Sequence, residues 1–141
     1  MSFELHPQLV RDCIPLGAFP LCRLLLMNDA HYPWFILVPQ RENLRELHEL
    51  TESDLFLYMH ESGLLARTLQ AVFKPDKLNI AALGNVVPQL HVHHIARYVT
   101  DPAWPAPVWG RLPALPYAEA QLGALRGRML QALEGTVFLP E

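Results

Sequence analysis

Two histidines set two residues apart, His91 and His93, are the side chains in this sequence whose types and spacing best suit chemistry. On a β-strand alternate residues point to the same face, so Gln89 shares a face with both imidazoles. We call these three residues the ladder. The opposite face of the strand carries Leu90, Val92 and His94. Burying three polar side chains costs free energy unless each finds a partner, so the ladder either lines a cleft or belongs to a hydrogen-bonded network.

Three kinds of site fit the ladder. Imidazoles at this spacing can share a metal ion, but a third ligand must come from elsewhere in the chain. A structural network of hydrogen bonds is the simplest interpretation of an arbitrary pair of histidines. The third is catalysis, because a neutral imidazole is a competent nucleophile and a neighbouring imidazolium can protonate a leaving group. Gly84 would let the backbone approach a phosphate, and Asn85 or Gln89 could offer an amide N–H. Spacing alone leaves all three open.

The composition excludes several classes of protein. A chain of 141 residues with 51% hydrophobic and 18% charged residues predicts one folded domain, residues 1–141, and not a disordered chain. A net charge of −3 argues against broad binding to nucleic acid or to an anionic membrane, but permits a small anionic ligand. We expect a cytoplasmic protein, because no signal peptide pattern or membrane span is visible and the two cysteines form no CxxC motif.

The elements that must position the ladder follow from periodicity and from turn residues. Helices are expected at 6–13, 52–73 and 117–133, a helical turn within 43–50, and strands at 19–28, 34–38, 77–83, 90–99 and 137–139. Thr51 has the features of an N-cap for the long helix, which Pro75 ends. Its expected core positions are Leu55, Met59, Leu65, Ala66, Leu69 and Phe73.

Residues 101–116 form a proline-rich segment with two indoles, Trp104 and Trp109. Repeated prolines cannot donate regularly into a sheet, so a stiff loop is expected. Two interpretations stay open for the indoles: a rigid strap over the core, or the wall of a pocket or subunit contact. We interpret His31, in the connection between two strands, as a solvated loop residue, and the alternative is a role in a site, because loops carry function.

Residues 84–97 resemble the signature of the histidine triad (HIT) superfamily, Gly-Gln-(Ser/Thr)-Val-x-His-φ-His-φ-His-φ-φ, where φ is apolar. Gly84 and Asn85 align with its start, and Gln89, His91 and His93 with its three histidine positions. The hairpin of residues 28–39 and the long helix are also similar to the family pattern. The resemblance covers roughly residues 19–100, followed by a C-terminal loop and helix at 101–141.

The resemblance implies an α+β fold with an antiparallel five-stranded sheet, one main helix, a second C-terminal helix, and a homodimer. It implies that His91 attacks the α-phosphate of a nucleotide-type substrate and that His93 supports the site. Gly84, Asn85 and Gln89 would bind the substrate near its phosphate, and Asn28 or Asp29 near its ribose. No metal ligand set and no other cofactor is required for the nucleophilic step, and no nucleic acid or membrane partner is implied.

Three positions depart from the family pattern: Gln89 replaces the first histidine, Val86 replaces a hydroxyl residue, and His94 occupies an apolar position. The expected function is a hydrolase or nucleotidyl transferase that cleaves a nucleoside phosphoramidate or a dinucleoside polyphosphate. The substitutions motivate an alternative, a nucleotide-binding module of the same fold without catalysis. A metal-dependent enzyme using His91, His93 or His94 is a third possibility.

Overall fold

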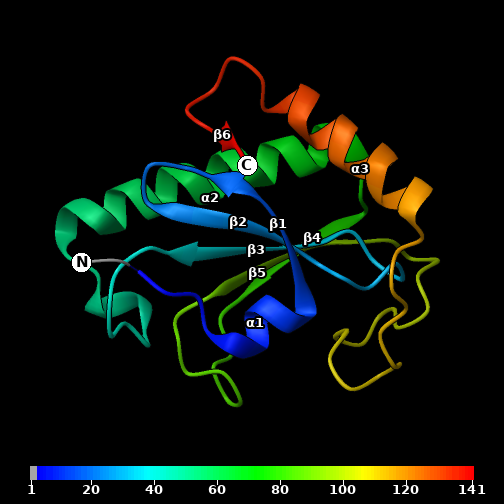
Figure 1. The fold of residues 1–141 in the computed structure, drawn as a ribbon. Helices are drawn as coiled ribbons and strands as arrows, with labels where there is room; N and C mark the ends of the chain where they lie inside the picture. The colour runs from blue at the N-terminus through cyan, green and yellow to red at the C-terminus, as the bar shows by residue number, and fades with distance from the viewer. Residues whose placement is uncertain (1–2) are drawn as a thin grey trace.

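The computed structural model describes residues 3–141, in which one antiparallel sheet separates two layers of covering elements (Figure 1). Helices α2 (Glu52–Phe73) and α3 (Glu119–Ala132) lie on one face, and α1 (Pro7–Asp12) lies on the other. A short 3-10 turn, η1 (Leu47–Glu49), precedes α2. The strands are β1 (Cys13–Ala18), β2 (Cys22–Met27), β3 (Trp34–Pro39), β4 (Lys77–Ala81), β5 (Val92–Arg97) and β6 (Leu139–Pro140).

The sheet has the order β4-β5-β3-β2-β1-β6, and every neighbouring pair is antiparallel. The predicted hairpin is β2 and β3, and the predicted pairing of the ladder strand with its predecessor is β5 and β4. On the other side of β5 lies β3, where Trp34 stands opposite Ile95 and Ile36 opposite His93. The ladder strand is therefore enclosed between two neighbours, with β4 forming the edge.

The strand count differs from the predicted five, because β6 adds a sixth strand of two residues at the edge beside β1. The sequence predicted no strand at β1, which contains Pro15 and Gly17. Both residues flank a shift in the pairing register between β1 and β2, which lets the strand continue past them. A Cβ atom at Gly17 would overlap the carbonyl oxygen of Leu139, so the close approach of β6 requires glycine there.

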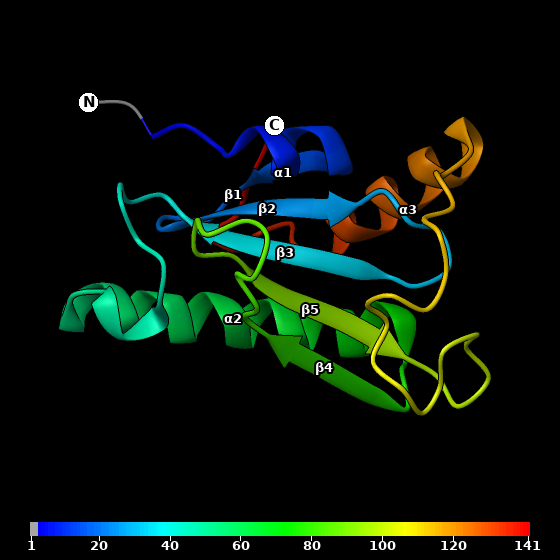
Figure 2. The same cartoon turned by 90° about the horizontal axis from the view of Figure 1, so that it is seen from below.

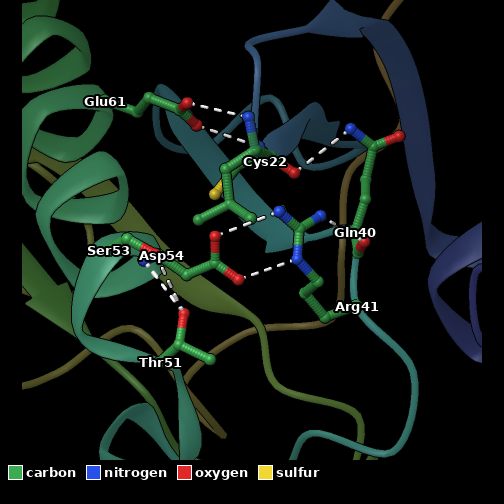
Figure 3. Close-up of polar contacts among 8 residues, drawn as sticks. Cys22, Gln40, Arg41, Thr51, Ser53, Asp54 and Glu61 are labelled. Carbon is green, nitrogen blue, oxygen red and sulfur yellow. Dashed lines mark hydrogen bonds and ion pairs between the residues drawn. The ribbon is translucent and has the colours of Figure 1, made fainter.

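Helix α2 begins as predicted, with the Thr51 side chain accepting a hydrogen bond from the Asp54 N–H at 3.2 Å. Further along α2, the fully buried carboxylate of Glu61 accepts the backbone N–H groups of Leu21 and Cys22, both at 2.8 Å (Figure 3). Figure 3 also shows Arg41 and Asp54 joined as an ion pair near the start of the helix. The Glu61 bonds tie α2 to the start of β2, and the Arg41–Asp54 pair ties α2 to the segment that follows β3.

The apolar core is divided by the sheet into two clusters. Leu65 and Leu69 of α2 are buried as predicted, in the cluster between the sheet and the long helices. The prediction that Leu55 and Met59 face the core was wrong: Leu55 is 39% exposed and Met59 is 61% exposed, beside Phe56 at 71%. The second cluster lies under α1 and residues 101–116, on the opposite face.

Candidate active site

The ladder histidines lie where the chain enters β5, on the face that α1 covers. The rings of His91 and His93 meet edge to face with centroids 5.0 Å apart, so the predicted shared face is confirmed. His91 Nδ1 lies 2.7 Å from the carbonyl oxygen of Gln89. A carbonyl can only accept, so Nδ1 carries the proton and the Nε2 lone pair is free. Burial lowers the pKa of His91 below its usual value, which keeps this ring neutral at pH 7.

His93 has the opposite tautomer. The indole N–H of Trp34 donates to His93 Nδ1 at 2.9 Å, and an indole can only donate. The neutral His93 ring therefore carries its hydrogen on Nε2. Burial, followed by the nearby His91 and His94, lowers the pKa of His93 to about 3. His93 is thus a neutral hydrogen-bond donor, whereas the sequence had suggested an imidazolium at this position.

His94 belongs to the other face of the sheet, as predicted from the alternation of the strand. Its Nε2 lies 2.7 Å from the hydroxyl oxygen of Ser62 on α2, and its Nδ1 donates to the Val92 carbonyl oxygen at 3.1 Å. The ring is 1% exposed, and burial lowers its pKa to about 4. His94 therefore joins α2 to the sheet and takes no part in the cluster of His91 and His93.

Gln89 is engaged with the N-terminal segment. Its side-chain oxygen accepts the His6 backbone N–H at 2.9 Å, and its side-chain amide donates to the Glu4 carbonyl oxygen at 2.9 Å. The structure places Gly84 and Asn85 in the connection before β5, where Asn85 is exposed and Gly84 has a φ of +74°. Within residues 3–141, the Gln89 side chain is thus hydrogen-bonded, whereas that of Asn85, also predicted to bind near the phosphate, has no hydrogen bond.

Two pockets lie at opposite ends of the strands. The tryptophan pocket, about 380 Å³, is lined by Arg11, Asp12, Met27, Asn28, Asp29, Trp34, Val108, Trp109, Gly110, Leu112, Ala114 and Pro116. The Gln89 pocket, about 320 Å³, is lined by His6, Asn43, Leu44, Arg45, Pro88 and Gln89. Figure 2 shows the connections that form each pocket gathered beyond opposite ends of β3 and β5. Along the ladder, His91 and His93 therefore lie between Gln89, which lines one pocket, and Trp109, which lines the other.

Trp109 forms the wall between the tryptophan pocket and the ladder. Its ring lies 5.1 Å from that of His93 and 5.9 Å from that of Trp34, centroid to centroid, in both cases edge to face. For Trp109, the structure therefore favours the pocket-wall interpretation over that of a simple strap. Trp104, by contrast, packs against the Arg97 guanidinium, 5.6 Å from its ring centroid.

The proline-rich segment is held in place from β5. Arg97 donates to both carboxylate oxygens of Asp101, at 2.8 and 3.1 Å, and to the Ala106 carbonyl oxygen at 2.8 Å. It also donates to Asn79 on β4 at 2.8 Å. Both charged side chains are almost fully buried. The strand that carries His93 therefore also fixes the loop that packs on His93.

Asn28 and Asp29, the residues expected near a ribose, lie side by side in the lining of the tryptophan pocket. Asn28 accepts the Tyr117 N–H at 2.9 Å. One oxygen of Asp29 contacts His31 Nδ1 at 2.7 Å and accepts the backbone N–H groups of His31 and Leu115. His31 is therefore paired with a buried carboxylate, in contrast to the solvated residue that the sequence suggested.

Two functional neighbours were missed from the sequence. Trp34 reads as one more aromatic residue of an apolar strand, and its bond to His93 follows from the register between β3 and β5. His6 lies 83 residues from Gln89, and no local pattern predicts that contact. Within residues 3–141, no three His, Cys, Asp or Glu side chains are arranged to hold a metal ion. No helix of the same region is long and apolar enough to cross a membrane.

Comparison with known proteins finds solved structures of the same fold. Three solved structures match nearly the whole chain. A histidine triad protein from Marinobacter aquaeolei VT8 is 46% identical, with a TM-score of 0.92 over 95% of this chain and 98% of that one. Histidine triad proteins from Bradyrhizobium japonicum and Sinorhizobium meliloti 1021 are 42% and 46% identical, with TM-scores of 0.92 and 0.90. They cover 94% and 93% of this chain and 98% and 97% of their own.

A hypothetical histidine triad nucleotide-binding protein from Sulfolobus tokodaii strain 7 shares the fold at 16% identity and a TM-score of 0.65, over 89% of this chain and 88% of that one. Among curated proteins, none matches this sequence. The family model of the HIT domain matches residues 9–100, about two-thirds of the chain. The chain therefore belongs to the HIT family.

Proposed function

We propose that this protein is a hydrolase or nucleotidyl transferase that cleaves a nucleoside phosphoramidate or a dinucleoside polyphosphate at the α-phosphate. The HIT superfamily is one of nucleotide-binding hydrolases and transferases, which supports the class of activity. The observation that carries the proposal is the bond from His91 Nδ1 to the Gln89 carbonyl. It fixes the ring so that Nε2 keeps its lone pair, which is the state a nucleophile requires.

In the proposed reaction, His91 Nε2 forms a bond to the α-phosphorus, and the bond from phosphorus to the leaving group breaks with its electron pair on the leaving atom. A phosphate leaving group departs as an anion, and an amine leaving group takes a proton from solvent as it departs. Water or an acceptor then displaces the nucleotidyl group from His91. His93 donates a hydrogen bond from its Nε2–H to a phosphate oxygen, and this bond stabilises the negative charge that develops there. The nucleoside would occupy the tryptophan pocket, since Trp34 and Trp109 offer aromatic surface and Asn28 and Asp29 lie beside them.

The proposal is tested by trapping the intermediate. Protein is mixed with adenosine monophosphoramidate or diadenosine tetraphosphate labelled at the α-phosphate, and then denatured at alkaline pH, where a phosphorus–nitrogen bond survives. We expect label on the wild-type protein and none on His91→Gln. His48→Gln, which changes an exposed histidine on η1, should label like the wild type. Full turnover by His91→Gln would exclude the mechanism.

Gln89 motivates one competing function, a nucleotide-binding module without catalysis. It occupies a triad position but cannot titrate, and both of its side-chain groups are bonded to the N-terminal segment. Calorimetry with the same two nucleotides separates the possibilities. Nucleotide binding without labelling of His91 or turnover would favour the module, whereas label on His91 excludes it.

We also propose that the protein is a homodimer formed through α2 and the edge strand β4. Phe56 and Met59 on α2 are largely exposed, and Ile80 on β4 is 48% exposed. Figures 1 and 2 show α2 covering one face of the sheet, on the side of β5 and the edge strand β4. An apolar surface beside an unpaired strand edge is typical of a protein interface. Sedimentation analysis should give a dimer for the wild type and a monomer for Phe56→Glu, and a monomeric wild type would contradict the proposal.

A further inference from the structure

The Gln89 side chain binds the backbone of the segment before α1 through a donor and an acceptor, as one β-strand binds its neighbour. Its side-chain amide offers a donor and an acceptor that pair with the Glu4 carbonyl and the His6 N–H. Both bonds join residues more than 80 positions apart in the chain. They place His6 in the lining of the Gln89 pocket, beside the residue that replaces the first histidine of the family signature.

The tautomer of His6 is fixed by its role as the N-cap of α1. Its Nδ1 accepts the Gln8 backbone N–H at 3.0 Å, so the neutral ring carries its hydrogen on Nε2. His6 and His93 therefore have the same tautomer, opposite to that of His91. The His6 backbone N–H bonds to the Gln89 side chain, and the Gln89 carbonyl oxygen contacts His91 Nδ1, so Gln89 links His6 to His91.

The two ends of the ladder differ in chemistry. The tryptophan pocket, beyond His93, has aromatic walls and the residues proposed for the ribose. The Gln89 pocket has one cation, Arg45, and no carboxylate among its lining residues within 3–141. If the nucleoside binds in the tryptophan pocket, the bond that breaks at the α-phosphorus points toward the Gln89 pocket. An anionic leaving group there would lie near the Arg45 guanidinium.

We infer that His6 is a further catalytic residue, whose Nε2–H donates a hydrogen bond to the departing oxygen of a phosphate-type leaving group bound in the Gln89 pocket. This inference rests on the proposed function. In the step, the His91 Nε2 lone pair forms the nitrogen–phosphorus bond while the phosphorus–oxygen bond to the leaving group breaks. The electron pair stays on that oxygen, which accepts the hydrogen bond from His6. No proton leaves His6, and the phosphate departs as a stable anion.

The test separates the two halves of the reaction with labelled diadenosine tetraphosphate. The leaving group is present when His91 becomes labelled, but has gone when water releases the label. His6→Asn keeps a side-chain acceptor for the Gln8 N–H and the backbone bond to Gln89, but removes the imidazole. We expect labelling of His91 to slow by about a hundredfold, the loss typical of one preorganised donor, and release of the label to stay within about twofold. His48→Asn is the surface control.

Gln89→Leu provides a second variant, because it keeps His6 and removes its anchor. We expect it to slow labelling more than release, by a smaller factor than His6→Asn. Equal slowing of both steps by His6→Asn would mean that the residue only supports His91, and would overturn the inference. Unchanged labelling in His6→Asn would also overturn it, while the function proposed for His91 would stand. If the wild type never becomes labelled, the proposed function fails and the role of His6 fails with it.

Discussion

Replacing Trp34 by phenylalanine removes the donor that fixes the tautomer of His93. The indole N–H lies 2.9 Å from His93 Nδ1, and both side chains are buried, at 6% and 4% exposure. Phenylalanine keeps an aromatic ring at this position but leaves Nδ1 without its partner. An unsatisfied buried acceptor costs about 1–3 kcal/mol, and we expect the free energy of unfolding of Trp34→Phe to fall by at least that much.

The same change should alter the protonation of His93. In the wild type, protonating Nδ1 breaks the bond to Trp34 and charges a buried ring, and the pKa is about 3. Without the indole, Nδ1 can accept a proton at no cost in hydrogen bonding. We expect the pKa of His93 to rise toward 6.5 while staying below it, because burial, its largest cause, remains.

Nitrogen NMR of the imidazole rings measures the tautomer and the pKa in one titration. At neutral pH, the wild type should show His93 with a bare Nδ1 and a protonated Nε2, and His91 with the reverse. Trp109→Phe is the matched control, since Trp109 packs against His93 through ring contacts. It should leave the His93 tautomer unchanged. A wild-type His93 with its proton on Nδ1 would refute the reasoning, as would equal shifts of the His93 pKa in both variants.

Three further predictions concern stability and are checked by urea unfolding. His93 and His94 have pKa values of about 3 and 4 in the folded protein and about 6.5 in the unfolded chain. Their contribution to the free energy of unfolding is therefore fully present above pH 6.5 and is lost as the pH falls. Between pH 6 and 4, these two should lower the free energy of unfolding by about 2–3 kcal/mol per pH unit, and a flat profile there would contradict their burial as neutral rings. Arg97→Met leaves Asp101 buried without its partner and should cost about 3–5 kcal/mol, whereas a loss under 1 kcal/mol would mean that Asp101 reaches water. Glu61→Gln replaces one of the two carboxylate oxygens by an NH2 group, which would face a backbone N–H without an acceptor, and should cost about 1–3 kcal/mol. No loss of stability would show that the loop of Leu21 and Cys22 does not need the carboxylate.

The fold could be read from the sequence where local patterns and capping residues agree. The bounds 52–73 for α2 follow from Thr51 and from the residues before Pro75, and the structure has the same bounds. The ladder strand was predicted as 90–99 and is Val92–Arg97. In contrast, β1 contains a proline and a glycine, which no local pattern permits inside a strand. It forms because β2 and β6 pair with it from both sides.

The exposed apolar side chains of α2 show another limit of periodicity. Met59 lies on an apolar spacing with Leu55 and Leu65, so the sequence predicts burial for all three. Spacing identifies an apolar face, but it does not tell whether that face meets the core of the same chain or a second molecule. Leu65 packs against the sheet, and Met59 is 61% exposed.

The same limit applies to the site. Strand alternation identified His91 and His93 on one face, because that rule needs only neighbours in sequence. Their tautomers depend on a carbonyl two residues away and on an indole from another strand, and neither contact was predicted from the sequence. The segment that carries Trp109 lies beyond the part of the chain that matches the HIT domain. The position of that segment depends on Arg97, which does lie within the match.

The substitution at Gln89 is coherent with these contacts. A primary amide presents a donor and an acceptor side by side, as a backbone peptide does, and can therefore pair with the carbonyl of Glu4 and the N–H of His6 at once. The two nitrogens of an imidazole point away from each other and cannot make this pair. The chain thus has an amide at position 89 and, bonded to it, an imidazole at position 6, attached to α1 and not to β5. A neutral donor on a separate element can be aimed at the leaving group without disturbing the strand that orients His91.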